Sequence, residues 1–214
     1  MEKQFRRYEK VIGLCFLFAT VTYAIGNQMI ENGVHGHLEL SSTRLGIVFE
    51  LINSFAVVII GWMSSKVLKS YNKSIIKGYM FARFIEGFLL AVGAISVLLL
   101  SQANIEPILK LRELCFSLAM LSLGAFSSYY CWYLLKKRLA PKWMMGLGII
   151  GYLCLLIYSI ITLISELSPI WLFTPGGFFE LIFPIYLIIK GLNRSRPFND
   201  SLNNSTIVHL INRP

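Results

Sequence analysis

Four charged residues lie inside long apolar runs of this sequence. They are Glu50, Arg83, Glu86 and Glu180. A charge within a membrane-spanning segment is costly, so it usually faces the protein interior and has a partner there. Carboxylates beside a guanidinium in such a place can carry protons, bind a solute or fix the register of packed helices. The sequence therefore predicts one intramembrane polar network built from these four residues.

The spacing of the four residues favours a common layer. Arg83 and Glu86 are three positions apart, so they share one face of a helix. At about 1.5 Å per residue, Glu86 and Glu180 lie roughly 14 and 15 Å from the basic ends of their helices. Glu50 lies roughly 9 Å from the opposite end, so we expect it about one turn above the others. Three carboxylates beside one guanidinium cannot all stay ionised in a low dielectric, so one of them must bind a proton or reach water.

Two interpretations of this network follow. In the structural one, a buried network fixes helix register, with Asn53, Ser54 and Tyr79 as hydrogen-bond partners. In the functional one, the residues line a proton-linked or ligand-binding cavity, where Arg83 holds an anion and a glutamate carries protons. We place the structural interpretation first, because the chain is small and its loops are short.

The elements that must position these residues are membrane-spanning helices. Hydrophobic residues make up 56% of the 214 positions and charged residues only 14%, against about 25% charged in soluble domains. A helix needs about 20 apolar residues to cross a bilayer. Six runs qualify: Val11–Ile30, Leu45–Ser65, Ile75–Leu100, Leu114–Leu135, Trp143–Ile164 and Ile170–Leu192. The sequence predicts an all-α protein with one six-helix transmembrane domain over residues 1–192 and a polar, flexible cytoplasmic tail over residues 193–214.

The distribution of basic residues predicts the topology. Of the 20 Lys and Arg, 16 lie before the first run, in or beside the loops after the second and fourth runs, or at the end of the sixth run and beyond it. Basic residues accumulate on the cytoplasmic side, so both termini should lie inside. The net charge of +9 is then a topology signal rather than a nucleic-acid face. We expect the basic inner loops to contact anionic lipid head groups.

The sixth run is irregular, and two conformations remain open for it. A break at Pro175–Gly177 would start a new helix near Phe178 and put Glu180 in its first turn, where the helix dipole favours a carboxylate. Alternatively, the run forms one helix kinked by its prolines.

The remaining candidates for chemistry are weak. Glu113, next to Arg112, is expected to form an interfacial pair at the outer mouth or to extend the polar network outward. His35 and His37, in a glycine-containing loop, make a poor chelate without further ligands. No cysteine pair has redox or zinc spacing, and no phosphate-binding or dinucleotide motif occurs. The sequence thus predicts no catalytic residue, metal or cofactor.

Three segments resemble one known family. They are Lys77–Glu86, Arg138–Trp143 with Gly146 and Gly148 after it, and Phe179–Leu181 continuing to Ile189–Gly191. These segments are similar to the bacterial membrane family of domain of unknown function 4386, in which Arg83, Glu86 and Glu180 match intramembrane charges. The resemblance implies a six-helix fold in a bacterial plasma membrane and no established activity.

Three functions are compatible with these observations. The first is a non-enzymatic regulatory or partner-binding membrane protein. The second is a proton- or small-solute-coupled carrier that uses the Arg/Glu cluster. The third is a membrane enzyme acting on lipid, which is disfavoured because no His lies in the apolar runs and Asp200 is the only Asp.

Overall fold

The described part of the chain contains helices and no strand. The computed structural model describes residues 2–34, 40–68, 73–99, 105–165 and 167–193. Its elements are α1 (Glu2–Val34), α2 (Leu40–Val67), α3 (Lys73–Ser96), the 3₁₀ helix η1 (Val97–Leu99), α4 (Ile105–Lys136), α5 (Lys142–Ser165), the 3₁₀ helix η2 (Ile170–Leu172) and α6 (Phe173–Ile189). Six helical spans, the last joining η2 to α6, are long and apolar enough to cross a membrane. The predicted all-α, six-helix class is confirmed, whereas the predicted tail and the His35–His37 loop lie outside the described residues.

The fourth helix begins much earlier than its apolar run predicts. The expected start was Leu114, but α4 begins at Ile105. Pro107 lies in the first turn of α4, where its missing N–H would have no intrahelical partner in any case. Arg112 and Glu113 therefore lie on a helix face rather than in a loop.

The sixth helix is continuous, so the broken conformation considered above is wrong for this structure. Helix α6 starts at Phe173 and runs through Pro175, Gly176 and Gly177 to Ile189. Pro175 is the third residue of α6, which explains why it does not interrupt the helix. Glu180 therefore lies two turns into α6, away from its dipole end.

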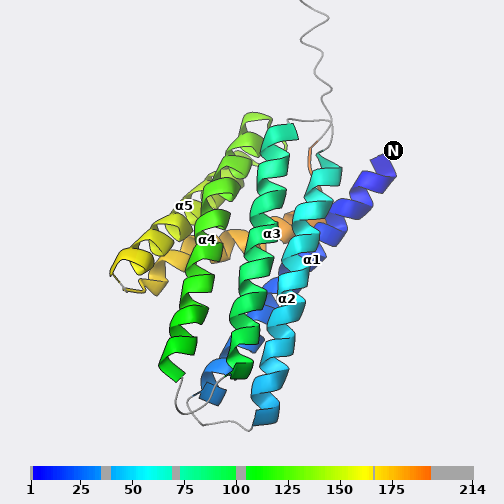
Figure 1. The fold of residues 1–214 in the computed structure, drawn as a ribbon. Coiled ribbons are helices and arrows are strands. Elements are labelled where there is room, and N and C mark those ends of the chain that lie inside the picture. The colour runs from blue at the N-terminus through cyan, green and yellow to red at the C-terminus, as the bar shows by residue number, and fades with distance from the viewer. Residues whose placement is uncertain (1, 35–39, 69–72, 100–104, 166, 194–214) are drawn as a thin grey trace, which may run out of the picture.

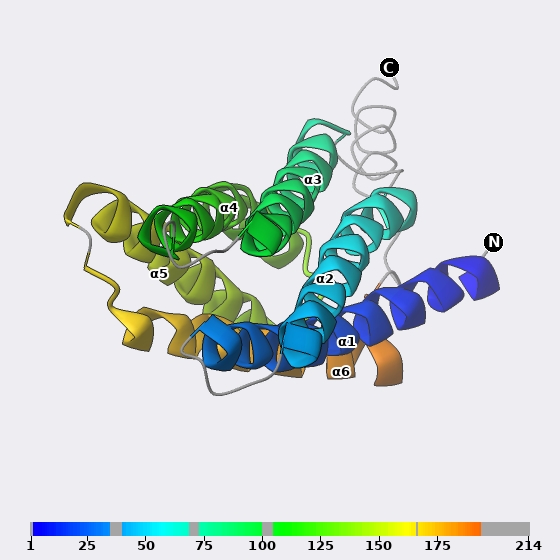
Figure 2. The same ribbon diagram turned by 60° about the horizontal axis from the view of Figure 1, so that its bottom comes forward.

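The six helices form a closed bundle in which each packs on its neighbour in the chain. Helix α1 also packs against α6, which completes the ring. Figure 1 shows α2, α3 and α4 side by side and roughly parallel, with α6 slanting across behind them. Figure 2 shows α1 and α6 lying along the same side of the bundle. The interior is therefore bounded by α1 and α6 on one side and by α2 to α5 on the other.

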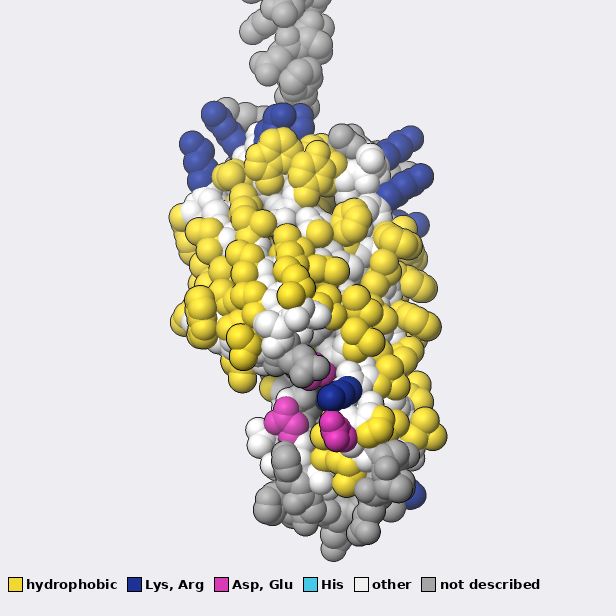
Figure 3. Space-filling view, turned by 60° about the vertical axis from the view of Figure 1, so that its left-hand side comes forward, with side chains coloured by type: hydrophobic (Ala, Val, Ile, Leu, Met, Phe, Trp, Pro, Cys, Tyr) yellow, Lys and Arg dark blue, Asp and Glu magenta, His cyan; other side chains and the backbone are white. Residues whose placement is uncertain are grey.

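The outer surface agrees with a protein embedded in lipid. Large apolar side chains are exposed on the outside of the bundle, among them Phe55, Phe88 and Ile164. On the face that Figure 3 shows, hydrophobic side chains form a broad band, and Lys and Arg gather at one end of it. Such a band flanked by charge is the expected form of a membrane-spanning surface.

One arginine fastens α1 to the end of α6. Arg6 donates hydrogen bonds to the carbonyl oxygens of Leu187, Ile188 and Ile189, the last two at 2.7 Å. The final carbonyls of a helix have no intrahelical partner, so a guanidinium satisfies them well. Gly191 follows with a φ of 77°, which glycine adopts readily. This contact closes the bundle at its basic end.

Helices α5 and α6 cross at two glycines, and this crossing sets the position of Glu180. A Cβ placed on Gly151 would lie 2.7 Å from the Cα of Gly176, whereas a Cβ on Gly146 of the same helix would meet nothing within 4 Å. We expect Gly151→Ala to lower the free energy of unfolding by about 1–2 kcal/mol, because backbone atoms must move apart. Gly146→Ala, the matched control, should be neutral or stabilising. Thermal unfolding in detergent compares the two, and equal midpoints would contradict the close crossing.

Candidate functional site

The inner polar cluster is centred on Arg83, near the middle of α3. Its side chain is fully buried, and its guanidinium pairs with Glu86 at 3.0 Å. The Nε atom donates a hydrogen bond to the hydroxyl of Tyr79 at 3.0 Å. The guanidinium also lies over the ring of Phe16, 4.8 Å from its centre, which is a favourable cation–π distance. Arg83 is therefore held by its own neighbours on α3 and α1.

Tyr152 of α5 connects this cluster to Glu180 of α6. An Nη atom of Arg83 donates to the Tyr152 hydroxyl at 3.2 Å, and that hydroxyl lies 3.4 Å from an oxygen of Glu180. Within the described residues Glu180 makes no ion pair, and Tyr152 is its hydrogen-bond partner. The chain Arg83–Tyr152–Glu180 thus joins helices α3, α5 and α6.

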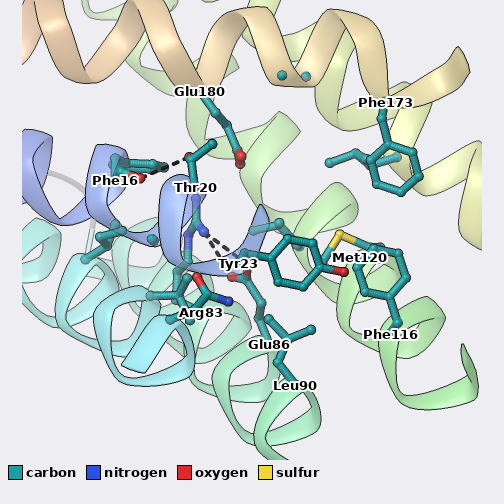
Figure 4. Close-up of a pocket in the computed structure, with 18 residues that line it drawn as sticks. Phe16, Thr20, Tyr23, Arg83, Glu86, Leu90, Phe116, Met120, Phe173 and Glu180 are labelled. Carbon is teal, nitrogen blue, oxygen red and sulfur yellow. Dashed lines mark hydrogen bonds and ion pairs between the residues drawn. The ribbon is translucent and has the colours of Figure 1, made fainter. Parts of the chain in front are cut away.

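The carboxylate of Glu180 faces a partly open cavity between the helices. The cavity has a volume of about 170 Å³, and Arg83, Glu86, Asn53 and Glu180 contribute to its walls. In Figure 4, Glu180 points in from α6 on the side opposite Arg83 and Glu86. The rest of the wall is mostly apolar: Phe16, Ala19, Thr20, Tyr23, Val57, Ile60, Leu90, Phe116, Met120, Leu123, Leu155, Phe173, Gly176 and Gly177. We name this space the inner cavity.

A second ion pair lies farther along the bundle, towards the end opposite the basic surface. Both terminal nitrogens of Arg112 on α4 donate to the two oxygens of Glu50 on α2, one of them at 2.7 Å. Arg112 also donates to Asn27 of α1 at 2.9 Å, and Asn27 donates to Glu31 at 2.8 Å. This forked, charge-assisted arrangement ties α1, α2 and α4 together.

The Arg112–Glu50 pair borders a larger cavity of about 380 Å³, which we name the outer cavity. The charged side chains on its wall are Arg112, Glu31, Glu50 and Glu113. Its formal charge balance is therefore two negative charges in excess. The inner cavity, with Arg83, Glu86 and Glu180, has one in excess. Both cavities are acidic inside a chain whose net charge is +9.

Four side chains line both cavities and separate them. They are Tyr23, Leu90, Phe116 and Phe173. Phe116 stacks on Tyr23 with ring centres 6.0 Å apart and lies 5.8 Å from Phe173. We name these four residues the aromatic partition. Figure 4 shows its three rings gathered at one end of the inner cavity.

The structure brings together some of the predicted network and separates the rest. Arg83, Glu86 and Glu180 border one cavity, with Tyr79 as a direct partner of Arg83. Glu50 pairs with Arg112 instead and borders the outer cavity.

Ser54 and Arg112 have partners other than the ones the sequence suggested. Ser54 donates to the backbone carbonyl of Glu50 rather than to a charged side chain. Arg112 turns inward to Glu50 and does not pair with Glu113. Glu113 instead accepts a hydrogen bond from Ser168 at 3.0 Å and borders the outer cavity.

Sequence reasoning missed Tyr152, the inward role of Arg112 and the aromatic partition. Tyr152 had a usable signal, because a tyrosine in the middle of a spanning helix needs a partner for its hydroxyl. Glu9 was also missed: it is buried on α1 and lies 3.4 Å from Arg6. The sequence shows the spacing of this pair, because residues three positions apart share a face of a helix, but it does not show that Glu9 is buried.

The described residues offer little for metal or thiol chemistry. No group of three or more His, Cys, Asp or Glu side chains in this part of the chain is arranged to hold a metal ion. The four cysteines are free thiols spread over three helices.

Among three comparisons with known proteins, one gives a match. A search of curated proteins returns no match, and a search of solved structures returns none either. The family described as domain of unknown function DUF4386 matches residues 11–191. That range begins within α1, covers the other five helices, and includes the inner cluster, the outer ion pair and the aromatic partition. The chain therefore belongs to the family described as domain of unknown function DUF4386, and its six long apolar helices make it a multi-pass membrane protein.

Proposed function

We propose that this protein is a proton- or small-cation-linked carrier whose binding site is the inner cavity. The observation that carries the proposal is Glu180, a carboxylate that faces the cavity without an ion-pair partner among the described residues. A single proton or monovalent cation at Glu180 would neutralise the one excess negative charge of that cavity. A carrier needs a state with its cargo bound and a state without it, and the presence or absence of a cation at Glu180 can distinguish these two states.

The geometry argues for a cationic rather than an anionic cargo. Arg83 was the expected anion-binding group, yet its guanidinium is already engaged by Glu86, Tyr79 and Tyr152. An anion would have to displace Glu86 and would meet Glu180 across the cavity. The role of Arg83 is then to hold Glu86 and to orient Tyr152 towards Glu180.

An unfilled cavity beside the cluster also weighs against a purely structural network. Side chains that only fix helix register gain from dense packing and complete pairing. Here about 170 Å³ of space adjoins a carboxylate with one hydrogen-bond partner. The regulatory or partner-binding interpretation, placed first on the sequence alone, does not require such a space.

The two cavities suggest the route. The outer cavity offers an acidic entrance, and the aromatic partition borders both this cavity and the inner cavity that Glu180 lines. Towards the basic end of the bundle lie the Tyr79–Tyr130 stack, with ring centres 4.0 Å apart, and the Arg6 contact with α6. Alternating access would open these two barriers in turn.

The orientation forms part of the proposal. The basic end of the bundle lies in the cytoplasm, as the excess of Lys and Arg there supports, so both termini are inside. The outer cavity then faces away from the cytoplasm, and the basic loops contact anionic head groups. The family resemblance supports a location in a bacterial plasma membrane. The transport role, without catalysis, rests on the inner cavity and Glu180.

Flux through Glu180 tests the function. Vesicles containing the full chain and an entrapped pH dye are given an outward gradient of sodium, potassium or tetramethylammonium, none of which crosses lipid as a neutral form. We expect at least one of these gradients to drive proton uptake, and Glu180→Gln to slow that uptake at least tenfold. Glu106→Gln, an exposed Glu on α4 outside both cavities, is the matched control. Uptake equal to that of protein-free vesicles for all three cations would refute the proposal.

A further inference from the structure

We propose that the inner cavity selects a compact organic ammonium ion with one positive charge, bound with its charged group at Glu180 and its apolar body among the aromatic side chains. This inference rests on the proposed carrier function and adds the chemical class of the cargo. It depends on three features of the cavity: its charge, its wall and its size.

The charge of the cavity fits one monovalent cation. Glu180 has Arg83, Glu86, Tyr152 and Cys131 as its titratable or charged neighbours. Since Arg83 and Glu86 form an ion pair with each other, one carboxylate remains to be neutralised. A divalent cation would leave the cavity with excess positive charge, and an anion would double its negative charge.

The wall of the cavity favours an organic over an inorganic cation. A bare metal cation needs several oxygen ligands to replace its water shell. Apart from Glu86 and Glu180, the side chains of the wall offer few oxygens, those of Thr20, Tyr23 and Asn53. The remainder is apolar and includes the rings of Phe16, Tyr23, Phe116 and Phe173.

Aromatic faces attract ammonium groups, and apolar walls stabilise the carbon body that carries such a group. Figure 4 shows this division: the carboxylate of Glu180 lies on one side and the rings of Phe116 and Phe173 on another. A ligand with a charged head and an apolar ring would satisfy both sides at once.

The size of the cavity limits the ligand to about one ring. A cavity of about 150 Å³ in another protein accommodates one benzene molecule, and the inner cavity measures about 170 Å³. We therefore expect a ligand of about six to eight non-hydrogen atoms. Benzylammonium has a suitable size and charge, whereas a two-ring amine should not fit.

Binding conserves charge if one proton leaves for each ammonium ion that enters. In the empty cavity a proton on a Glu180 oxygen neutralises the excess charge. When the ammonium ion arrives, that O–H bond breaks and the proton passes to water in the outer cavity. No other group changes its bonding, so the exchange is electroneutral.

A series of probes with one ring and different charges tests the ligand class. Isothermal titration of the full chain in detergent at neutral pH would compare benzylammonium with neutral benzyl alcohol and anionic benzoate. We expect benzylammonium to bind at least tenfold more tightly than benzyl alcohol, and benzoate to give no measurable heat. 1-Naphthylmethylammonium, with the same charge and two rings, should bind at least tenfold more weakly than benzylammonium. The wild-type protein alone answers these questions, so they do not depend on the folding of a variant.

Substitution of the carboxylate then locates the site. Glu180→Gln should weaken benzylammonium binding at least tenfold and leave benzyl alcohol binding within about twofold. Glu106→Gln should change neither. Release of one proton per benzylammonium bound, measured in two buffers of different ionisation enthalpy, should disappear in Glu180→Gln.

The outcomes separate this inference from the function on which it rests. Equal binding of benzylammonium and benzyl alcohol would overturn the ligand class, and so would proton uptake driven only by sodium or potassium. Neither result contradicts the proposed carrier function. If no probe binds and none of the three cation gradients drives proton uptake, the carrier function itself is wrong.

Discussion

The Arg83→Met variant is expected to lose about 3–5 kcal/mol of its free energy of unfolding, the largest effect we anticipate for a single substitution. Arg83 is buried completely, and its removal leaves the Glu86 carboxylate without its ion-pair partner. It also removes a donor to Tyr152, which bridges to Glu180. Equilibrium unfolding in mixed detergent micelles measures the loss.

A second substitution distinguishes a stranded charge from simple loss of packing. In the double variant Arg83→Met, Glu86→Gln, the unpaired carboxylate is gone, so most of the lost stability should return. Lys110→Met is the control, because the Lys110–Glu106 pair on α4 is exposed and such pairs contribute little. If the double variant is as unstable as Arg83→Met alone, the loss does not come from the uncompensated charge of Glu86.

The helical class was predictable because it depends on composition and run length. Six apolar runs are enough to predict six spanning helices, since lipid leaves few other ways to satisfy the backbone. The helix ends were less predictable: α1 and α4 extend well beyond their apolar runs into polar sequence. Run length marks the part of a helix inside the hydrocarbon, not the whole helix.

The pairing of charges was only partly predictable. Arg83 and Glu86 are neighbours on one helix, so spacing alone brings them together. The pairing of Glu50 with Arg112 joins residues 62 positions apart. It depends on the early start of α4, which turns Arg112 from a loop residue into an inward-facing one. Helix rotation and packing decide such contacts, and one sequence does not specify them.

The aromatic partition could not be predicted for a related reason. Tyr23, Phe116 and Phe173 come from α1, α4 and α6, and each is ordinary in an apolar helix. Only their convergence between two cavities gives them a role. For α6 the sequence suggested a feature that the structure does not have. Its Pro and Gly residues favoured a break, but α6 is one helix, and Gly176 packs closely against Gly151 of α5.

The second large effect is expected at the outer ion pair. Glu50→Gln or Arg112→Met should each lower the free energy of unfolding by about 2–3 kcal/mol, because either change leaves a largely buried charge without its forked partner. The loss should be smaller than for Arg83, since the Arg112 side chain remains 15% exposed, against 2% for Arg83. Together the two substitutions should cost clearly less than the sum of the single losses, and the difference is their coupling energy.

A double-mutant cycle in mixed micelles measures that coupling, with Glu113→Gln as the matched control. Glu113 borders the same cavity, yet it is exposed and accepts a hydrogen bond from Ser168, so its substitution should leave stability unchanged. Additive losses for Glu50 and Arg112 would mean that the pair does not join α2 to α4. A strong coupling energy would assign a structural role to the Glu50–Arg112 pair and so distinguish it from the inner cluster. The outer pair would hold the helices around the entrance, and Glu180 alone would remain available to exchange its proton.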